Sequence, residues 1–157
     1  MESLALLLIV ATPIFVLLVL LGFLWLLFTV FARTSRWNAL AARYPASMEP
    51  EGRKLTVQTI KVGVVRWRFC VTMVLSPRGL YLDVGPRFPV LAAIHRHPPV
   101  LIPWSEFHSP RPGRLYLGWQ ATQLSVGQPE IAALTFPQGL YEQMTPYLTS
   151  AREEPPR

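Results

Sequence analysis

The sequence is poor in the residue types on which several common functions depend. It has one cysteine, Cys70, so an intramolecular disulfide is excluded, and this cysteine reads as a small buried hydrophobe because its surroundings are apolar. Only 15% of the residues are charged, and the carboxylates Asp83, Glu106, Glu130 and Glu142 are isolated from one another. There is no glycine-rich phosphate loop, nucleophile elbow or metalloprotease helix. We therefore expect no enzymatic activity, no catalytic residue and no cofactor.

Charge is also missing from most of the N-terminal region. After a short stub at residues 1–3, no charged residue occurs between Leu4 and Ala32, and Leu, Ile, Val and Phe dominate. At about 1.5 Å per residue, a helix over this stretch is longer than a hydrocarbon core of roughly 30 Å. The sequence predicts one transmembrane helix over residues 4–32, with Pro13 as the expected bend. The alternative, a cleaved signal peptide, requires a basic start and a shorter apolar core.

The residues that flank this stretch predict its orientation. Glu2 precedes it and arginines follow it, which places the N-terminus outside and the C-terminal domain on the cytoplasmic side of the cell membrane. Residues 33–52 are expected to form an amphipathic helix along the membrane surface and a linker, with the helix ending at Pro45. The expected anchors at the membrane interface are Trp25, Arg33, Arg36, Trp37 and Arg43.

Residues 53–151 change to the alternating pattern of a mainly-β domain. The clearest strand covers Val64–Leu75, with apolar residues at odd positions and Arg66 and Arg68 on the other face. Ser76–Gly79 suits a type I turn into a strand over 80–84. Five further strands are predicted at residues 55–62, 100–104, 115–119, 122–126 and 131–136. Pro103 makes one of them an edge strand or a bulged strand. Residues 137–150 return to helical spacing, and 152–157 form a loose tail.

This order of elements resembles the pleckstrin-homology (PH) superfold and its GRAM-like relatives. The stretches Gly79-Leu80-Tyr81-Leu82 and Ile102-Pro103-Trp104-Ser105-Glu106-Phe107 are similar to pieces of small bacterial membrane-tethered proteins of this kind. The resemblance covers roughly residues 52–151. It implies an open barrel of about seven antiparallel strands in two nearly orthogonal sheets, with a C-terminal capping helix. A lipocalin-like or other small barrel is the alternative.

Lys61, Arg66 and Arg68 are the candidate lipid-headgroup residues. The resemblance implies a basic residue before the first hairpin turn and a basic-x-basic pair after it, and these three residues stand in that pattern around Gly63. Arg66 and Arg68 are two positions apart in a strand, so their side chains point the same way and can converge on a phosphate. The alternative is an ordinary solvated strand face.

The proline-rich loop over residues 85–99 is a candidate contact for a protein partner or for lipid headgroups. Its basic residues are Arg87, His95, Arg96 and His97. His95 and His97 could share a face, but a third ligand is missing, so we expect no metal site. The alternative is an ordinary surface loop.

Two functions remain open at this point. The first is a non-enzymatic accessory or structural subunit of a larger bacterial membrane protein complex, in which the PH-like domain covers a cytoplasmic face. The second is a membrane-tethered adaptor or sensor that binds anionic lipid headgroups. Membrane lipids and an integral membrane complex are the expected partners. Nucleic acid and a small-molecule substrate are not expected, since the arginines are scattered and a tether makes lipid the nearer source of phosphate.

Overall fold

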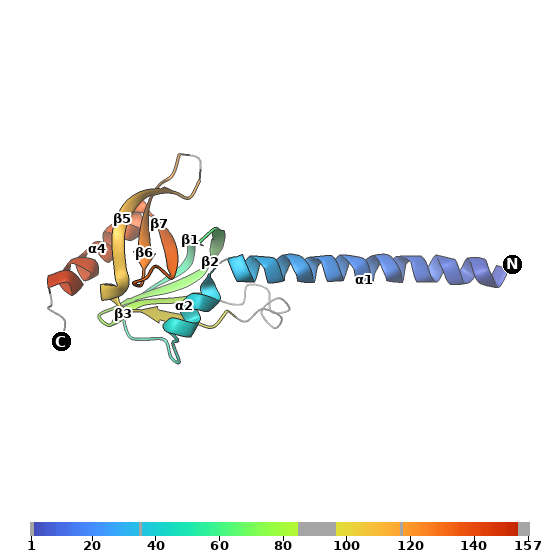
Figure 1. The fold of residues 1–157 in the computed structure, drawn as a ribbon, viewed down its shortest axis with the longest axis horizontal. Coiled ribbons are helices and arrows are strands. Elements are labelled where there is room, and N and C mark those ends of the chain that lie inside the picture. Colours follow the sequence, from blue (N-terminus) through green and yellow to red (C-terminus); the bar gives the residue numbers. More distant parts are fainter. Residues whose placement is uncertain (1, 35, 85–96, 117, 154–157) are drawn as a thin grey trace.

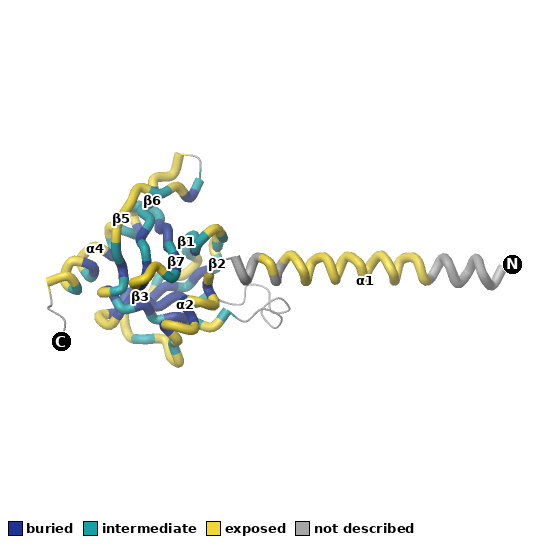
Figure 2. Tube along the Cα trace, viewed as in Figure 1, coloured by how far each residue is buried: buried dark blue, intermediate teal, exposed yellow. Residues whose placement is uncertain are grey.

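A long N-terminal helix projects from a β domain in the computed structural model, which describes residues 2–34, 36–84, 97–116 and 118–153 (Figure 1). The helix α1 (Glu2–Thr34) spans the predicted range and continues through Pro13 without a visible bend. The described side chains from residue 11 to residue 27 are all exposed, as Figure 2 shows. By length and hydropathy, no helix among the described residues qualifies as a membrane span.

A short second helix joins α1 to the β domain. This helix, α2 (Trp37–Arg43), follows Arg36, whose backbone adopts the left-handed conformation with φ 56°. Trp37 and Leu40 are both 0% exposed and belong to the domain's hydrophobic core. The expectation that this helix lies along the membrane with Trp37 as an interfacial anchor is therefore wrong, because its apolar face is covered by the sheet.

The β domain is one curled, seven-stranded antiparallel sheet that forms a half-barrel. Its order is β4-β3-β2-β1-β7-β6-β5, so β1 and β7 pair in the middle and join the two halves. The strands are β1 (Arg53–Val62), β2 (Val65–Ser76), β3 (Gly79–Val84), β4 (Val100–Ile102), β5 (Phe107–Arg114), β6 (Gln120–Val126) and β7 (Ala132–Pro137).

The turn between β2 and β3 forms as the sequence predicts. The Ser76 hydroxyl donates to the carbonyl oxygen of Gly79 at 2.8 Å and accepts from its N–H at 3.2 Å. A side chain at Gly79 would collide with the backbone of Ile102 on β4, so glycine is required by this close approach. The predicted edge strand is also confirmed, because β4 lies at one end of the sheet and ends before Pro103.

The C-terminal helix packs on the sheet as predicted. This helix, α4 (Gln138–Glu153), buries Leu140, Met144 and Leu148. It contacts β6, β7 and the short 3-10 helix η1 (Trp104–Glu106). The indole of Trp104 stacks on Tyr147 of α4, with ring centroids 5.1 Å apart. The helix therefore closes the open side of the core.

One predicted strand is misplaced. None of the described residues in 115–119 belongs to a strand, and the strand itself lies upstream at Phe107–Arg114. This strand contains Pro110 and Pro112, which argue against a central strand. It escapes that argument because β5 is the other edge of the sheet.

The long hairpin of β1 and β2 is interrupted by bulges in its middle. Val57 (φ 59°) and Phe69 (φ 51°) adopt the left-handed region, and the register shifts around Gln58. The backbone N–H of Phe69 donates to the Thr59 hydroxyl at 3.1 Å. The bulge turns Phe69 outward, leaving it 52% exposed, and the core face resumes at Val71. The strict alternation predicted for this strand is therefore wrong at Phe69, and Cys70 is only partly buried.

We expect Val57→Asn to raise the free energy of unfolding by about 1 kcal/mol. A left-handed conformation costs an L-residue roughly 1–2 kcal/mol, β-branched residues tolerate it worst, and asparagine tolerates it well. Val57 is 56% exposed, so little burial is lost. Chemical denaturation of the detergent-solubilised chain measures the change. Val57→Thr keeps the branched Cβ and should give no gain; an equal gain in both variants would contradict the strain argument.

Candidate functional site

The structure brings the three predicted headgroup residues together. Lys61 on β1 is directly opposite Arg66 on β2, and Arg68 lies two residues further along β2. Paired residues in an antiparallel sheet share a face, so all three project from the same side of the hairpin. This side is opposite to the core face that Ile60 and Trp67 occupy.

A tyrosine from another hairpin joins them. The guanidinium carbon of Arg66 lies 4.5 Å from the ring centroid of Tyr116, and that of Arg68 lies 5.1 Å from the same centroid. Trp119 packs edge-on against Tyr116, with centroids 5.2 Å apart. Each cation–π contact contributes about 0.5–1 kcal/mol at an exposed site. We call Lys61, Arg66, Arg68 and Tyr116 the basic face.

Tyr116 is the member of the basic face that sequence reasoning missed. The stretch that contains it was predicted as a strand, and nothing local to the sequence indicates that a residue fifty positions away would stack on Arg66. The sequence does offer one indication. Tyr116 and Trp119 lie close together in a segment that also contains Arg111, Arg114, Gly113 and Gly118.

The described residues supply no carboxylate partner to the basic face. Among these residues the one ion pair joins Lys54 to Glu49, with 2.8 Å between Nζ and Oε1. Lys61, Arg66 and Arg68 therefore carry three positive charges on neighbouring positions without a counter-ion from the described part of the chain. Like charges held this close favour the binding of an anion.

The basic face lies near the end of α1. Trp67, between the two arginines in sequence, packs edge-on against Trp37 with centroids 5.8 Å apart. Trp37 begins α2, and α1 ends at Thr34. In Figure 1 the β1–β2 hairpin lies beside this junction. Any surface that contains α1 would therefore lie close to the basic face.

The other predicted anchors are scattered. Trp25 is 60% exposed on α1, whereas the side chain of Arg33 lies outside the described residues. The guanidinium of Arg36 donates to the carbonyl oxygen of Ile131 at 3.3 Å, at the start of β7. Arg43 lines a small cleft on the domain.

Most of the predicted partner-contact loop cannot be placed. Arg87, His95 and Arg96 lie outside the described residues. His97 is described, and its ring packs between the indoles of Trp37 and Trp67, with centroids 6.1 and 4.8 Å away. No group of three or more His, Cys, Asp or Glu side chains that could hold a metal occurs in the described ranges.

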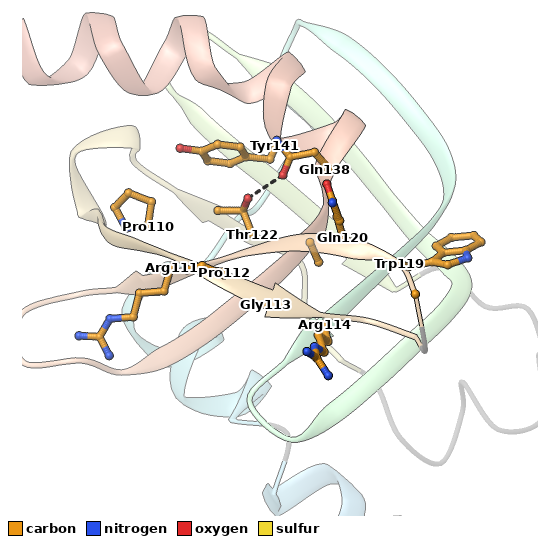
Figure 3. A pocket seen from close by; sticks show the side chains of 12 residues that line it. Pro110, Arg111, Pro112, Gly113, Arg114, Trp119, Gln120, Thr122, Gln138 and Tyr141 are labelled. Atoms are coloured by element: carbon orange, nitrogen blue, oxygen red, sulfur yellow. Dashed lines mark hydrogen bonds between the residues drawn. The ribbon is translucent and has the colours of Figure 1, made fainter.

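A second feature is a hollow of about 740 Å³ beside the β5–β6 hairpin. This hairpin extends past the point at which β7 ends and α4 begins, and the hollow lies in the angle between them (Figure 3). Trp119 stands at its rim and is 55% exposed. Arg111 and Arg114 extend from β5, while Thr122 and Tyr141 lie on the side of α4.

A smaller cleft of about 390 Å³ contains a partly buried hydrogen bond. The Tyr44 hydroxyl donates to Oε2 of Glu106 at 2.8 Å, which ties the end of α2 to η1. Burial raises the pKa of Tyr44 to about 12, and the hydrogen bond and negative charge of Glu106 act in the same direction.

Burial, followed by the charges of Asp83 and Glu49, also raises the pKa of Tyr81.

Comparison with known proteins does not identify a relative. No family model, no curated protein and no solved structure matches this chain. The functional argument therefore depends on the geometry of the chain itself.

We expect a late step in an alkaline titration of tyrosinate absorbance that Tyr44→Phe removes. The folded-state pKa of Tyr44 is above its ordinary value of 10, so this group stabilises the fold fully below pH 10. That contribution is lost as the pH rises from 10 through about 12. Glu106→Gln should move the step to lower pH but not abolish it, because burial remains. A wild-type titration without a late step, while circular dichroism reports a folded chain, would contradict this assignment.

Proposed function

We propose that this chain is a membrane-anchored, PH-like binding module. In this proposal α1 lies in the cell membrane of a bacterium and holds the half-barrel at its cytoplasmic surface, where the basic face binds anionic lipid headgroups. The observation that carries the proposal is the stacking of Arg66 and Arg68 on one tyrosine ring with no carboxylate partner among the described residues.

Membrane anchoring is supported by the composition and exposure of α1. Its apolar side chains are exposed on every side of the helix, including Phe15 at 67% and Trp25 at 60%. A helix that is apolar on all sides suits burial in lipid or in a large protein core. An amphipathic helix on a protein surface would instead have one polar side. The arginines that follow α1 favour a cytoplasmic domain.

The PH-like assignment is supported by the order of elements. Four strands form one meander and three form another, the two meet where β1 pairs with β7, and the chain then ends in a packed helix. This is the order that the resemblance implies, although the strands form one continuous curled sheet.

Binding of lipid headgroups is supported by position and charge together. The basic face lies next to the end of α1, so a membrane that holds α1 presents its headgroups within reach. Anionic leaflets attract such residues with about 1 kcal/mol for each Lys or Arg near the surface. Tyr116 orients the two guanidiniums in advance, so less side-chain freedom is lost when they bind a phosphate.

We expect the double change Arg66→Gln, Arg68→Gln to lower the preference for phosphatidylglycerol over phosphatidylcholine about thirtyfold. Two surface arginines contribute about 2 kcal/mol in total. The measurement is native mass spectrometry of the full chain released from bicelles that contain both lipids, comparing the two adducts.

The matched control is Arg78→Gln, Arg152→Gln, which removes the same charge from exposed positions on the β2–β3 turn and at the end of α4. It should retain the wild-type preference. Equal losses in the two double variants would reduce the effect to net charge and overturn the proposal. Recovery of the wild-type chain in the soluble fraction after alkaline carbonate treatment would remove the membrane anchor itself.

An accessory role in a larger membrane complex is the second candidate. Its support is two exposed apolar side chains at the bulges of β1 and β2, Val57 at 56% and Phe69 at 52%. The backbone turns both side chains outward at positions with positive φ, where neither residue type is favoured. Burial of these two side chains against a partner protein would remove their apolar surface from water.

We expect the chain to elute from native membranes, extracted in mild detergent, as part of a large stoichiometric assembly if this second role holds. Phe69→Ser should shift the chain to the size of the free protein, because it removes the apolar contact. Met48→Ser is the control, since Met48 is 79% exposed and lies outside the β1–β2 hairpin. Elution of the wild-type chain as a free monomer would exclude the accessory role.

A further inference from the structure

The tip of the β5–β6 hairpin presents an exposed tryptophan on a defined turn. The backbone N–H of Trp119 donates to the carbonyl oxygen of Tyr116 at 3.2 Å, and Gly118 adopts φ 83°. This left-handed conformation is the one that the third residue of a type II turn requires, and glycine adopts it without strain. The indole of Trp119 packs edge-on against Tyr116 but remains 55% exposed. The turn therefore holds a large aromatic side chain outside the core.

Packing fixes this tryptophan relative to the basic face. Tyr116 lies against the guanidiniums of Arg66 and Arg68, and its ring also contacts Trp119. Its neighbour Leu115 is 0% exposed, so the end of the hairpin is packed on the domain rather than free in solvent. One tyrosine thus joins the two arginines to an exposed aromatic side chain.

The end of this hairpin lies on the side of the half-barrel from which α1 leaves. Figure 1 shows it away from the axis of α1, while the β1–β2 turn lies beside the helix. The β1–β2 turn also carries an exposed apolar side chain, Val64 at 73%. A bilayer that contains α1 therefore faces an apolar side chain at each of the two hairpin tips, with residues of the basic face next to both.

The combination of these groups suits the boundary between lipid and water. A tryptophan has a large apolar ring and one N–H donor, and tryptophans are concentrated at the membrane interface for this reason. Arg66 and Arg68 suit the anionic headgroups of the same layer. The other tryptophans of the β domain are buried or packed against its core, so the exposure of Trp119 is not a general feature of this domain.

We propose that Trp119 is a second membrane contact of this chain. It inserts into the interfacial layer of the bilayer that holds α1, and the basic face is held against the headgroups between the two contacts. The contact through α1 sets the distance of the half-barrel from the membrane, and the second contact sets its tilt. This inference rests on the proposed membrane anchor.

The test is fluorine NMR of the full chain, labelled with 5-fluorotryptophan, in nanodiscs of phosphatidylglycerol and phosphatidylcholine. A lipid with a nitroxide at the carbonyl end of one acyl chain should broaden the Trp119 resonance beyond detection, because a nearby unpaired electron speeds its relaxation. Trp104 should keep its resonance, since it packs on Tyr147 of α4, at the far end of the domain from α1. A water-soluble gadolinium chelate should broaden the Trp119 resonance less than the lipid nitroxide does.

The resonances are assigned with single tryptophan-to-phenylalanine variants. Trp119→Phe should remove one resonance and leave the others in place, because this side chain is exposed. Stronger broadening of Trp119 by the gadolinium chelate than by the lipid nitroxide would overturn the inference, since it places the side chain in water.

Trp25 on α1 is the internal control that separates this inference from the anchor. Broadening of Trp25 by the lipid nitroxide, with an unchanged Trp119 resonance, would overturn the second contact and leave the anchor standing. A Trp25 resonance that the lipid nitroxide leaves sharp would overturn the anchor, and the second contact with it. The two proposals therefore fail with different signatures.

Discussion

The burial of Trp37 is the constraint that places the domain relative to the long helix. Its side chain is 0% exposed, its indole N–H donates to the carbonyl oxygen of Pro98 at 2.9 Å, and its ring packs on Trp67. Removing a buried tryptophan typically costs 3–5 kcal/mol, so this attachment is a strong one. Only two residues separate it from Thr34, and three Cα–Cα steps reach at most about 11 Å. The half-barrel is therefore held at the end of α1 rather than on a free tether.

The packing of Trp67 on Trp37 also determines which way its two neighbours in β2 point. Trp67 points into the core against Trp37, so its neighbours Arg66 and Arg68 project from the opposite face of the same strand. The pairing then extends the polar side of the sheet through four strand pairs. Arg66 is opposite Lys61, Lys61 is opposite Thr135, Thr135 is opposite Gln123, and Gln123 is opposite Arg111. A single row of paired residues thus leads from the basic face to the hollow.

Local sequence patterns predicted the elements whose chemistry is local. The hairpin turn at Ser76–Gly79, the helix that ends before Pro45 and the helix after β7 follow from turn residues and apolar spacing, and they are confirmed. The misplaced fifth strand depends on the whole sheet, since prolines are acceptable only at an edge and no local pattern says which strand is the edge. The sequence did not predict the burial of Trp37 for the same reason, because an apolar helix face suits a lipid surface and a sheet equally well.

The same distinction between local patterns and long-range contacts applies to the candidate site. Spacing of two in a strand was enough to place Arg66 and Arg68 on one face, but alternating arginines usually mean only a solvated surface. What separates these from that ordinary case is Tyr116, which lies about fifty residues away and holds both guanidiniums over one ring. Two like charges gain about 0.5–1 kcal/mol each from the ring, which offsets part of their mutual repulsion but neutralises neither. The fold orients these two cations, and the described residues give them no carboxylate partner. Their arrangement therefore favours the binding of an anion from outside the chain.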